Sequence, residues 1–153
     1  MYKTEAIITK VENFKENHLS ISVYSSEYGQ KSLVVFGGKS KKKNSTYVKG
    51  SLNNIEFDNN NVCLSSTSIN KFKWFLFSKY ELKTIDYFCF LINKLLFLTD
   101  QNSNVVSYYL LLISKLNERS NYLPELLLLE LEILKASGYQ PDLNESVLKK
   151  IFN

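Results

Sequence analysis

One run of residues in this chain could bind phosphate groups, Gly37-Gly38-Lys39-Ser40-Lys41-Lys42-Lys43. Its Gly38-Lys39-Ser40 segment ends like a nucleotide-binding P-loop, in which backbone amides of a glycine-rich turn surround the phosphates. That loop needs another glycine five residues earlier, where this chain has Leu33. The residues after Ser40 are lysines rather than the start of an apolar helix, so the run does not predict an NTPase.

The same run could instead bind the backbone of a nucleic acid, because each lysine that neutralises a phosphate releases a counterion. A run of lysines is also compatible with a solvated loop that binds nothing. Its position between two predicted strands of a small barrel favours the nucleic-acid interpretation, since such barrels bind single strands in basic grooves. The predicted phosphate contacts within the run are Lys39, Lys41, Lys42 and Lys43. Lys31 and Lys49 are expected near the same edge of the barrel and are predicted to bind phosphates as well.

Aromatic side chains near these lysines could stack on bases. The candidates are Tyr24, Tyr28, Phe36, Tyr47, Phe72 and Trp74, and about half or more of them should fill the core or the domain interface. We select Tyr47 and Trp74 as the predicted stacking residues. The stretch Lys71-Phe72-Lys73-Trp74 alternates charge and rings as a stacking surface does, but it equally suits the first turn of a helix that packs on the barrel.

Residues for catalysis or metal binding are scarce. His18 is the only histidine, and Cys63 and Cys89 form no CxxC pair, so Cys and His alone cannot supply a four-ligand zinc site. No nucleophile elbow, HExxH motif or carboxylate pair stands out, and the glutamates within 125–132 fit the wet face of a leucine-rich helix. We therefore predict no enzyme activity, no catalytic residues, no metal and no cofactor.

Positive charge is concentrated in the N-terminal half of the chain. Residues 1–75 contain eleven lysines and six acidic residues, a net charge of +5, whereas residues 76–153 contain eight basic and nine acidic residues, a net charge of −1. Arg119 is the only arginine. Lysine holds a phosphate as a point charge but lacks the planar fork with which arginine reads guanine, so we expect weak sequence specificity.

The N-terminal region predicts strands, because its apolar residues alternate with polar ones and turn residues separate the runs. The predicted strands cover residues 6–11, 19–24, 32–36, 47–57 with a break near Gly50, and 62–67. A tight hairpin is expected at Ser26-Glu27-Tyr28-Gly29. Five short strands with a basic loop in the middle suit a small β-barrel.

Near residue 70 the apolar spacing changes to a period of 3.6, which predicts helices to the end of the chain. The predicted helices cover residues 70–82, 85–99, 104–118, 124–137 and, more weakly, 145–152. The sequence thus predicts an α+β protein, with a barrel domain over residues 1–69 and an all-α domain over residues 70–153. Since 44% of the 153 residues are hydrophobic, a buried core is expected.

The sequence predicts neither export nor a membrane-spanning segment. The first residues lack an apolar signal core, and Asn93-Lys94 interrupts the longest apolar stretch, residues 88–98. We expect a cytoplasmic protein without a membrane partner.

Five stretches of the chain, taken in order, carry a likeness to a known family. They are Glu5-Ala6-Ile7-Ile8, Glu16, Ser26-Glu27-Tyr28-Gly29, Val34-Val35-Phe36-Gly37-Gly38-Lys39-Ser40-Lys41, and Leu128-Leu129-Glu130-Leu131-Glu132-Ile133-Leu134 followed by Gly138-Tyr139-Gln140-Pro141-Asp142-Leu143. In these stretches the chain resembles the recombination mediator RecO of bacterial DNA repair, a family with a helix that ends in Gly-Tyr-x-Pro-Asp-Leu.

The resemblance implies an OB-fold barrel followed by a helical domain, with Lys39, Lys41, Lys42 and Lys43 on the DNA-contacting surface. It implies binding to single- and double-stranded DNA, annealing of complementary strands, and help for RecA in replacing single-strand-binding protein in the RecF pathway. The implied partners are RecR and the acidic tail of single-strand-binding protein, and the implied location is the bacterial nucleoid.

Many RecO proteins continue past the Pro-Asp-Leu motif, whereas this sequence stops at Asn153. We therefore expect a short, C-terminally reduced member that keeps DNA binding and loses part of the partner docking. Two alternatives remain open on the residues alone. One is a protein-interaction adaptor built on the leucine-rich helices, and the other is an RNA-binding OB-fold protein, because lysines and aromatic rings do not distinguish the two sugars.

Overall fold

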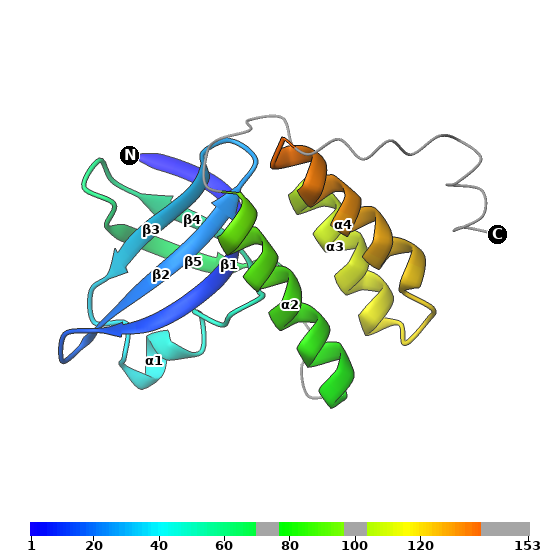
Figure 1. Cartoon of the computed structure of the whole chain (residues 1–153). Helices are drawn as coiled ribbons and strands as arrows, with labels where there is room; N and C mark the ends of the chain where they lie inside the picture. Colours follow the sequence, from blue (N-terminus) through cyan, green and yellow to red (C-terminus); the bar gives the residue numbers. More distant parts are fainter. Residues whose placement is uncertain (70–76, 97–103, 139–153) are drawn as a thin grey trace.

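A computed structural model describes residues 1–69, 77–96 and 104–138 (Figure 1). The elements in chain order are β1 (Tyr2–Phe14), β2 (His18–Ser25), β3 (Gly29–Val35), α1 (Lys41–Asn44), β4 (Leu52–Phe57), β5 (Cys63–Ser68), α2 (Lys79–Leu95), α3 (Val105–Asn117) and α4 (Leu123–Ala136).

The five strands form one antiparallel sheet in the order β3-β2-β1-β4-β5. The two ends of this sheet meet, because the Val34 N–H of β3 donates to the Asn61 carbonyl before β5 at 2.9 Å and Val34 pairs in parallel with Val62. A register shift in β1 between Ile8 and Lys10 marks a bulge, which lets the strand bend around the barrel. The predicted α+β fold with an N-terminal five-stranded barrel is confirmed.

The barrel interior is filled by residues of the strands and by Tyr47. The core residues are Ala6, Ile8, Leu19, Ile21, Val23, Leu33, Val35, Tyr47, Ile55, Phe57 and Cys63. The predicted hairpin between β2 and β3 is present, and Gly29 takes a φ of 64° there, a conformation that glycine adopts without steric cost. The period-two pattern located β1, β2 and β3 because one face of each is buried, whereas in β5 only Cys63 is buried.

The predicted strand over residues 47–57 is wrong in its first half. β4 begins at Leu52, and the residues before it form a loop in which Gly50 has a φ of 90°. The loop closes back on β1, since the Gly50 N–H donates to the Ile8 carbonyl at 2.6 Å. Tyr47 therefore reaches the core from a loop, which gives the same local pattern as a half-buried strand.

The predicted break between helices 70–82 and 85–99 is also wrong. Helix α2 runs without interruption from Lys79 to Leu95, and the Thr84 hydroxyl donates to the Tyr80 carbonyl within it at 3.0 Å. The helix begins after Ser78, whose backbone N–H donates to the Glu81 carboxylate. Helices α3 and α4 confirm the predictions for 104–118 and 124–137, whereas residues 70–76 and 145–152 lie outside the described part.

The barrel and the helices share a hydrophobic core. Ile7, Tyr24 and Leu52 on the outside of the barrel pack in one cluster with buried residues of α2, α3 and α4. The Tyr109 hydroxyl of α3 donates to the Gly50 carbonyl at 2.5 Å. Figure 1 shows α2 between the barrel and the α3–α4 pair. This packing holds α2 against the barrel, while the domain boundary at residue 70 stays a prediction.

None of the helices within the described ranges is long and apolar enough to cross a membrane.

Candidate nucleic-acid interface

The basic run does not project as a loop but folds over one end of the barrel. Gly37 turns the chain after β3 with a φ of 65°, and Gly38 then packs on the core. A Cβ at Gly38 would lie 2.9 Å from Leu19 Cγ, so a larger residue would clash there. The following residues Lys41–Asn44 form the single helical turn α1, none of which is buried. The two glycines bring the lysines onto the end of the barrel.

Two of these lysines bond to backbone carbonyls and draw a further lysine into the group. Lys39 Nζ donates to the Lys15 carbonyl at 2.8 Å, which places the hairpin between β1 and β2 beside the run. Lys43 Nζ donates to the Phe36 carbonyl at 3.1 Å. An ammonium has three donors, so both keep capacity for a phosphate. We call Lys15, Lys39, Lys41, Lys42 and Lys43 the basic cluster.

The outer surface of β1, β2 and β3 leads away from the basic cluster. Leu33 and Val35 point into the core, so Ser32 and Val34 point outward. The strand registers place outward residues of the three strands side by side. We call these residues the strand face, and they form three rows: Lys10 with Ser22 and Ser32, Glu12 with Ser20 and Val34, and Phe14 with His18, whose ring contacts Phe36.

The side chains of the strand face are accessible, and its charge is uneven. All of them are exposed or half-exposed. Lys10 Nζ, in the row furthest from Phe14, lies 2.7 Å from the carboxylate of Glu12 in the middle row, so these two rows are close to neutral. The small side chains of Ser20, Ser22 and Ser32 project little from this surface. The excess positive charge therefore stands at the end of the strand face that adjoins the basic cluster.

Exposed aromatic rings stand next to the basic cluster. Phe36 is 52% exposed and Phe14 is 38% exposed. The His18 ring meets Phe36 edge to face, with ring centroids 4.9 Å apart, and its Nδ1 accepts from the Gly37 N–H at 3.0 Å. Lys15 Nζ lies 5.4 Å from the centre of the Phe14 ring. Rings for stacking and cations for phosphates are thus combined at one end of the strand face.

The two predicted stacking residues are not placed at this surface by the structure. Tyr47 is only 8% exposed and contacts Cys63 Sγ through its hydroxyl at 3.7 Å in the barrel core. Burial raises the pKa of its hydroxyl, and its ring cannot reach a base in this conformation. Trp74 lies outside the described residues. Phe36, one of the six aromatic candidates but not one of the two predicted stacking residues, is exposed beside the basic cluster.

The two outlying lysines are separated from the basic cluster, contrary to the expectation of a shared edge. Lys49 Nζ lies 2.7 Å from the Asp86 carboxylate of α2. Lys31 alternates with Leu33 and Val35, so it lies at the opposite end of the barrel interior. There it lines a hollow of about 500 Å³ with Tyr2, Tyr28, Phe57, Asp58, Asn59 and Asn61. Lys31 is near the start of β3 and the lysine run follows its end, so the length of the strand separates them.

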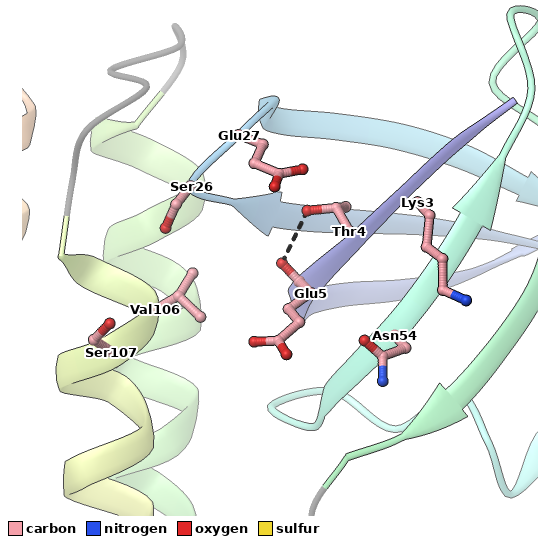
Figure 2. Close-up of a pocket in the computed structure, with 8 residues that line it drawn as sticks. All are labelled: Lys3, Thr4, Glu5, Ser26, Glu27, Asn54, Val106 and Ser107. Carbon is pink, nitrogen blue, oxygen red and sulfur yellow. Dashed lines mark hydrogen bonds between the residues drawn. The ribbon is translucent and has the colours of Figure 1, made fainter.

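The side of the barrel that faces α3 has a different character. A hollow of about 410 Å³ lies between the barrel and α3, and the residues that line it include Glu5, Glu27 and Lys3. Figure 2 shows these side chains. The Thr4 hydroxyl donates to the Glu5 carbonyl at 3.4 Å. Carboxylates repel phosphates, so this hollow does not extend the nucleic-acid surface.

The thiols of the barrel and of α2 are set up for packing rather than for reaction. Burial raises the pKa of the Cys63 thiol, and it raises the pKa of the Cys89 thiol to about 12. A thiol needs its thiolate form to act as a nucleophile, and a raised pKa removes that form at neutral pH. Within the described ranges no group of three His, Cys, Asp or Glu side chains is gathered to hold a metal ion.

The N-terminal half of the chain is similar to a known family. The family model described as "Recombination protein O N terminal" matches residues 1–85, which is more than half of the chain. The chain belongs to the RecO family. The match includes all five strands, the basic cluster and the first turns of α2. No curated protein matches the chain.

Membership confirms the resemblance seen in the sequence and gives the barrel its type, which is OB-fold-like. RecO proteins act in recombination and DNA repair, and the family is one of DNA-binding proteins. OB-fold barrels bind oligonucleotides on the face of strands 2 and 3 and at the adjoining loops. The strand face and Lys15, in the loop between β1 and β2, lie at corresponding positions of this chain, whereas Lys39, Lys41, Lys42 and Lys43 lie between β3 and β4.

Proposed function

We propose that this RecO protein is a non-enzymatic mediator that binds DNA, anneals complementary strands and helps RecA to replace single-strand-binding protein. The observation that carries the proposal is the junction of the basic cluster with the exposed rings of Phe14 and Phe36 on the OB-fold barrel. Lysines bind the phosphates there, and bases stack on the rings.

The residues of this surface favour backbone binding over base reading. Lysine bonds to phosphate from any sequence, whereas bidentate contacts to base edges are typical of arginine, asparagine and glutamine. Stacking on phenylalanine tolerates every base, because each base has a π-face. A mediator must act on any gap in the chromosome, so weak sequence preference suits the proposed role.

Annealing requires two negatively charged strands to approach each other. Neutralising the phosphates of one strand on the basic cluster lowers its repulsion of the second strand. Bases held by stacking on one side keep their pairing edges open toward solvent. The proposed action on strands coated with single-strand-binding protein, with RecR and the acidic protein tail as partners, rests on family membership.

The experiment measures annealing of complementary strands coated with single-strand-binding protein, with and without the acidic tail of that protein. We expect the chain to accelerate annealing and expect Lys41→Glu, Lys42→Glu and Lys43→Glu together to abolish the acceleration. The matched control reverses three exposed lysines of the helices, Lys79, Lys83 and Lys135. Loss of annealing in the control alone would contradict the role of the basic cluster.

Two other results would replace the proposal. Tighter binding to RNA than to a DNA oligonucleotide of the same sequence would indicate an RNA-binding protein, since a contact to the 2′-hydroxyl separates the two. Capture of a partner protein that is indifferent to nuclease, without any annealing, would indicate an adaptor. The half-exposed leucines of α4, of which Leu123 is 55% exposed, favour the adaptor as the second candidate.

A further inference from the structure

A groove of about 350 Å³ lies where α2 meets the outer surface of the barrel. It is lined from three strands and one helix, by Lys10, Ser22, Gln30, Phe90, Asn93 and Lys94. Lys10 and Ser22 belong to the row of the strand face that is furthest from Phe14 and His18. The groove is therefore the far end of the strand face, and the basic cluster is the near end.

The helix side of the groove carries an exposed ring beside a cation. Phe90 is 57% exposed, although its neighbours Phe88 and Cys89 are buried. Lys94 lies one helical turn further on, and its Nζ is 5.9 Å from the centre of the Phe90 ring. This repeats the combination of Phe14 with Lys15 at the near end, where the separation is 5.4 Å.

Asn93, which lines the groove, connects α2 to the strands through hydrogen bonds. The Asn93 amide donates from Nδ2 to the Thr9 carbonyl at 3.2 Å. Its Oδ1 accepts from the Thr9 hydroxyl at 2.7 Å and from Gln30 Nε2 at 3.0 Å. Because one side chain bonds to two strands, Phe90 and Lys94 are held in a defined position relative to the strand face.

We propose that this groove seats a nucleotide of single-stranded DNA, with its base against Phe90 and its phosphate at Lys94. This inference rests on the proposed function and extends it, because it carries the DNA path from the barrel onto helix α2. Lys10 is already paired with Glu12, so Lys94 supplies the cation of this end. The DNA strand is thus bound at both ends of the strand face, and the surface between them is nearly neutral and contains serines.

The distance between the two ends sets the length of DNA that can reach both. The rows of Phe14 and Lys10 are four residues apart on β1, which is about 13 Å at about 3.3 Å per residue. At the spacing of one strand of duplex DNA, about 3.4 Å per nucleotide, about four nucleotides lie between the ends. Oligonucleotides of four residues can occupy one end only, whereas those of twelve can occupy both.

The test compares the binding of fluorescein-labelled dT4 and dT12 to the full chain at low salt. We expect Phe90→Ala with Lys94→Gln to bind dT12 about tenfold more weakly, since one stacked base is lost, and to reduce the advantage of dT12 over dT4. Phe90→Trp should keep the tight binding to dT12. Tyr80→Ala is the matched control, because Tyr80 is a 76% exposed aromatic residue in the first turn of the same helix.

A second measurement locates the base directly. An oligonucleotide dT12 with 5-iododeoxyuridine is irradiated on the wild-type chain, and the crosslinked peptide is identified by mass spectrometry. We expect a crosslink within residues 84–94 that disappears in Phe90→Ala. Crosslinks confined to residues near the basic cluster would overturn the inference.

The outcomes separate this inference from the proposed function. If the Phe90 and Lys94 variant binds dT12 as the wild type does, while charge reversal of Lys41, Lys42 and Lys43 still weakens binding, the groove is not a nucleotide site and the proposed function stands. If the wild type binds neither oligonucleotide at low salt, the proposed function fails and the inference fails with it.

Discussion

Replacing Lys41, Lys42 and Lys43 together by glutamine should flatten the salt dependence of DNA binding. Glutamine has a helix propensity close to that of lysine, so α1 should form as before. At position 43 its amide keeps a donor near the Phe36 carbonyl, which accepts from Lys43 Nζ in the wild type. The substitution therefore removes charge with little change in shape.

The size of the effect follows from the number of lysines in the basic cluster. For single-stranded DNA each neutralised phosphate contributes about 0.7 to the slope of log affinity against log salt concentration. With one phosphate at each of its five lysines the basic cluster contributes about −3.5 to the slope, and the two lysines that remain in the variant contribute about −1.4. Between about 50 and 200 mM salt this contribution alone should cost the wild type about 100-fold in affinity and the variant only about sevenfold.

The assay is fluorescence anisotropy of a labelled dT12 oligonucleotide, titrated with protein at several salt concentrations. The control replaces Lys79, Lys83 and Lys135 of the helices by glutamine, which changes the net charge equally. A control slope close to that of the wild type separates contact at the basic cluster from the net charge of the molecule. Equal slopes for the wild type and the basic-cluster variant would refute the reasoning.

Further predictions concern residues that the structure removes from the proposed interface. Tyr47→Phe should leave DNA affinity unchanged, whereas Tyr47→Ala should lower the free energy of unfolding by about 3–5 kcal/mol in urea, because it empties part of the core. Lys49→Gln should change DNA affinity less than about twofold and unfolding by less than about 1 kcal/mol, since the ion pair with Asp86 is exposed to solvent. A loss of affinity comparable to that of the basic-cluster variant would place Lys49 at the DNA. Cys89 should resist iodoacetamide at pH 8 in the folded protein and react in urea, since its pKa is raised to about 12 and the thiolate forms only at higher pH. Rapid alkylation of the folded protein at pH 8 would contradict that placement.

Local sequence patterns were enough for most of the elements. Alternating apolar residues located β1, β2 and β3 because each of these strands has one face in the barrel core. The strand β5 was located as well, although only its Cys63 is buried. The same pattern failed before Leu52, since Tyr47 enters the core from a loop and imitates a strand residue. It also failed within α2, because no residue type near Thr84 distinguishes a helix break from a continuous helix.

The sequence by itself predicted the kind of ligand. A lysine run after a strand that ends in two glycines, in the more basic half of the chain, predicts a phosphate-binding surface with weak base selectivity. Family membership was also visible in the order of short motifs, and the family match over residues 1–85 confirms it.

Only the tertiary structure decided which residues share that surface. Lys15 meets Lys39 across 24 positions of sequence, and Phe90 reaches the strand face because Asn93 bonds to Thr9, 84 positions away. Conversely, Lys31 and Lys49 are close to the run in sequence but have other surroundings in the structure. Lys31 lies near the start of β3, and Lys49 forms an ion pair with Asp86 of α2. Strand register and helix packing are long-range contacts, so neighbours across a sheet cannot be found from neighbours along the chain.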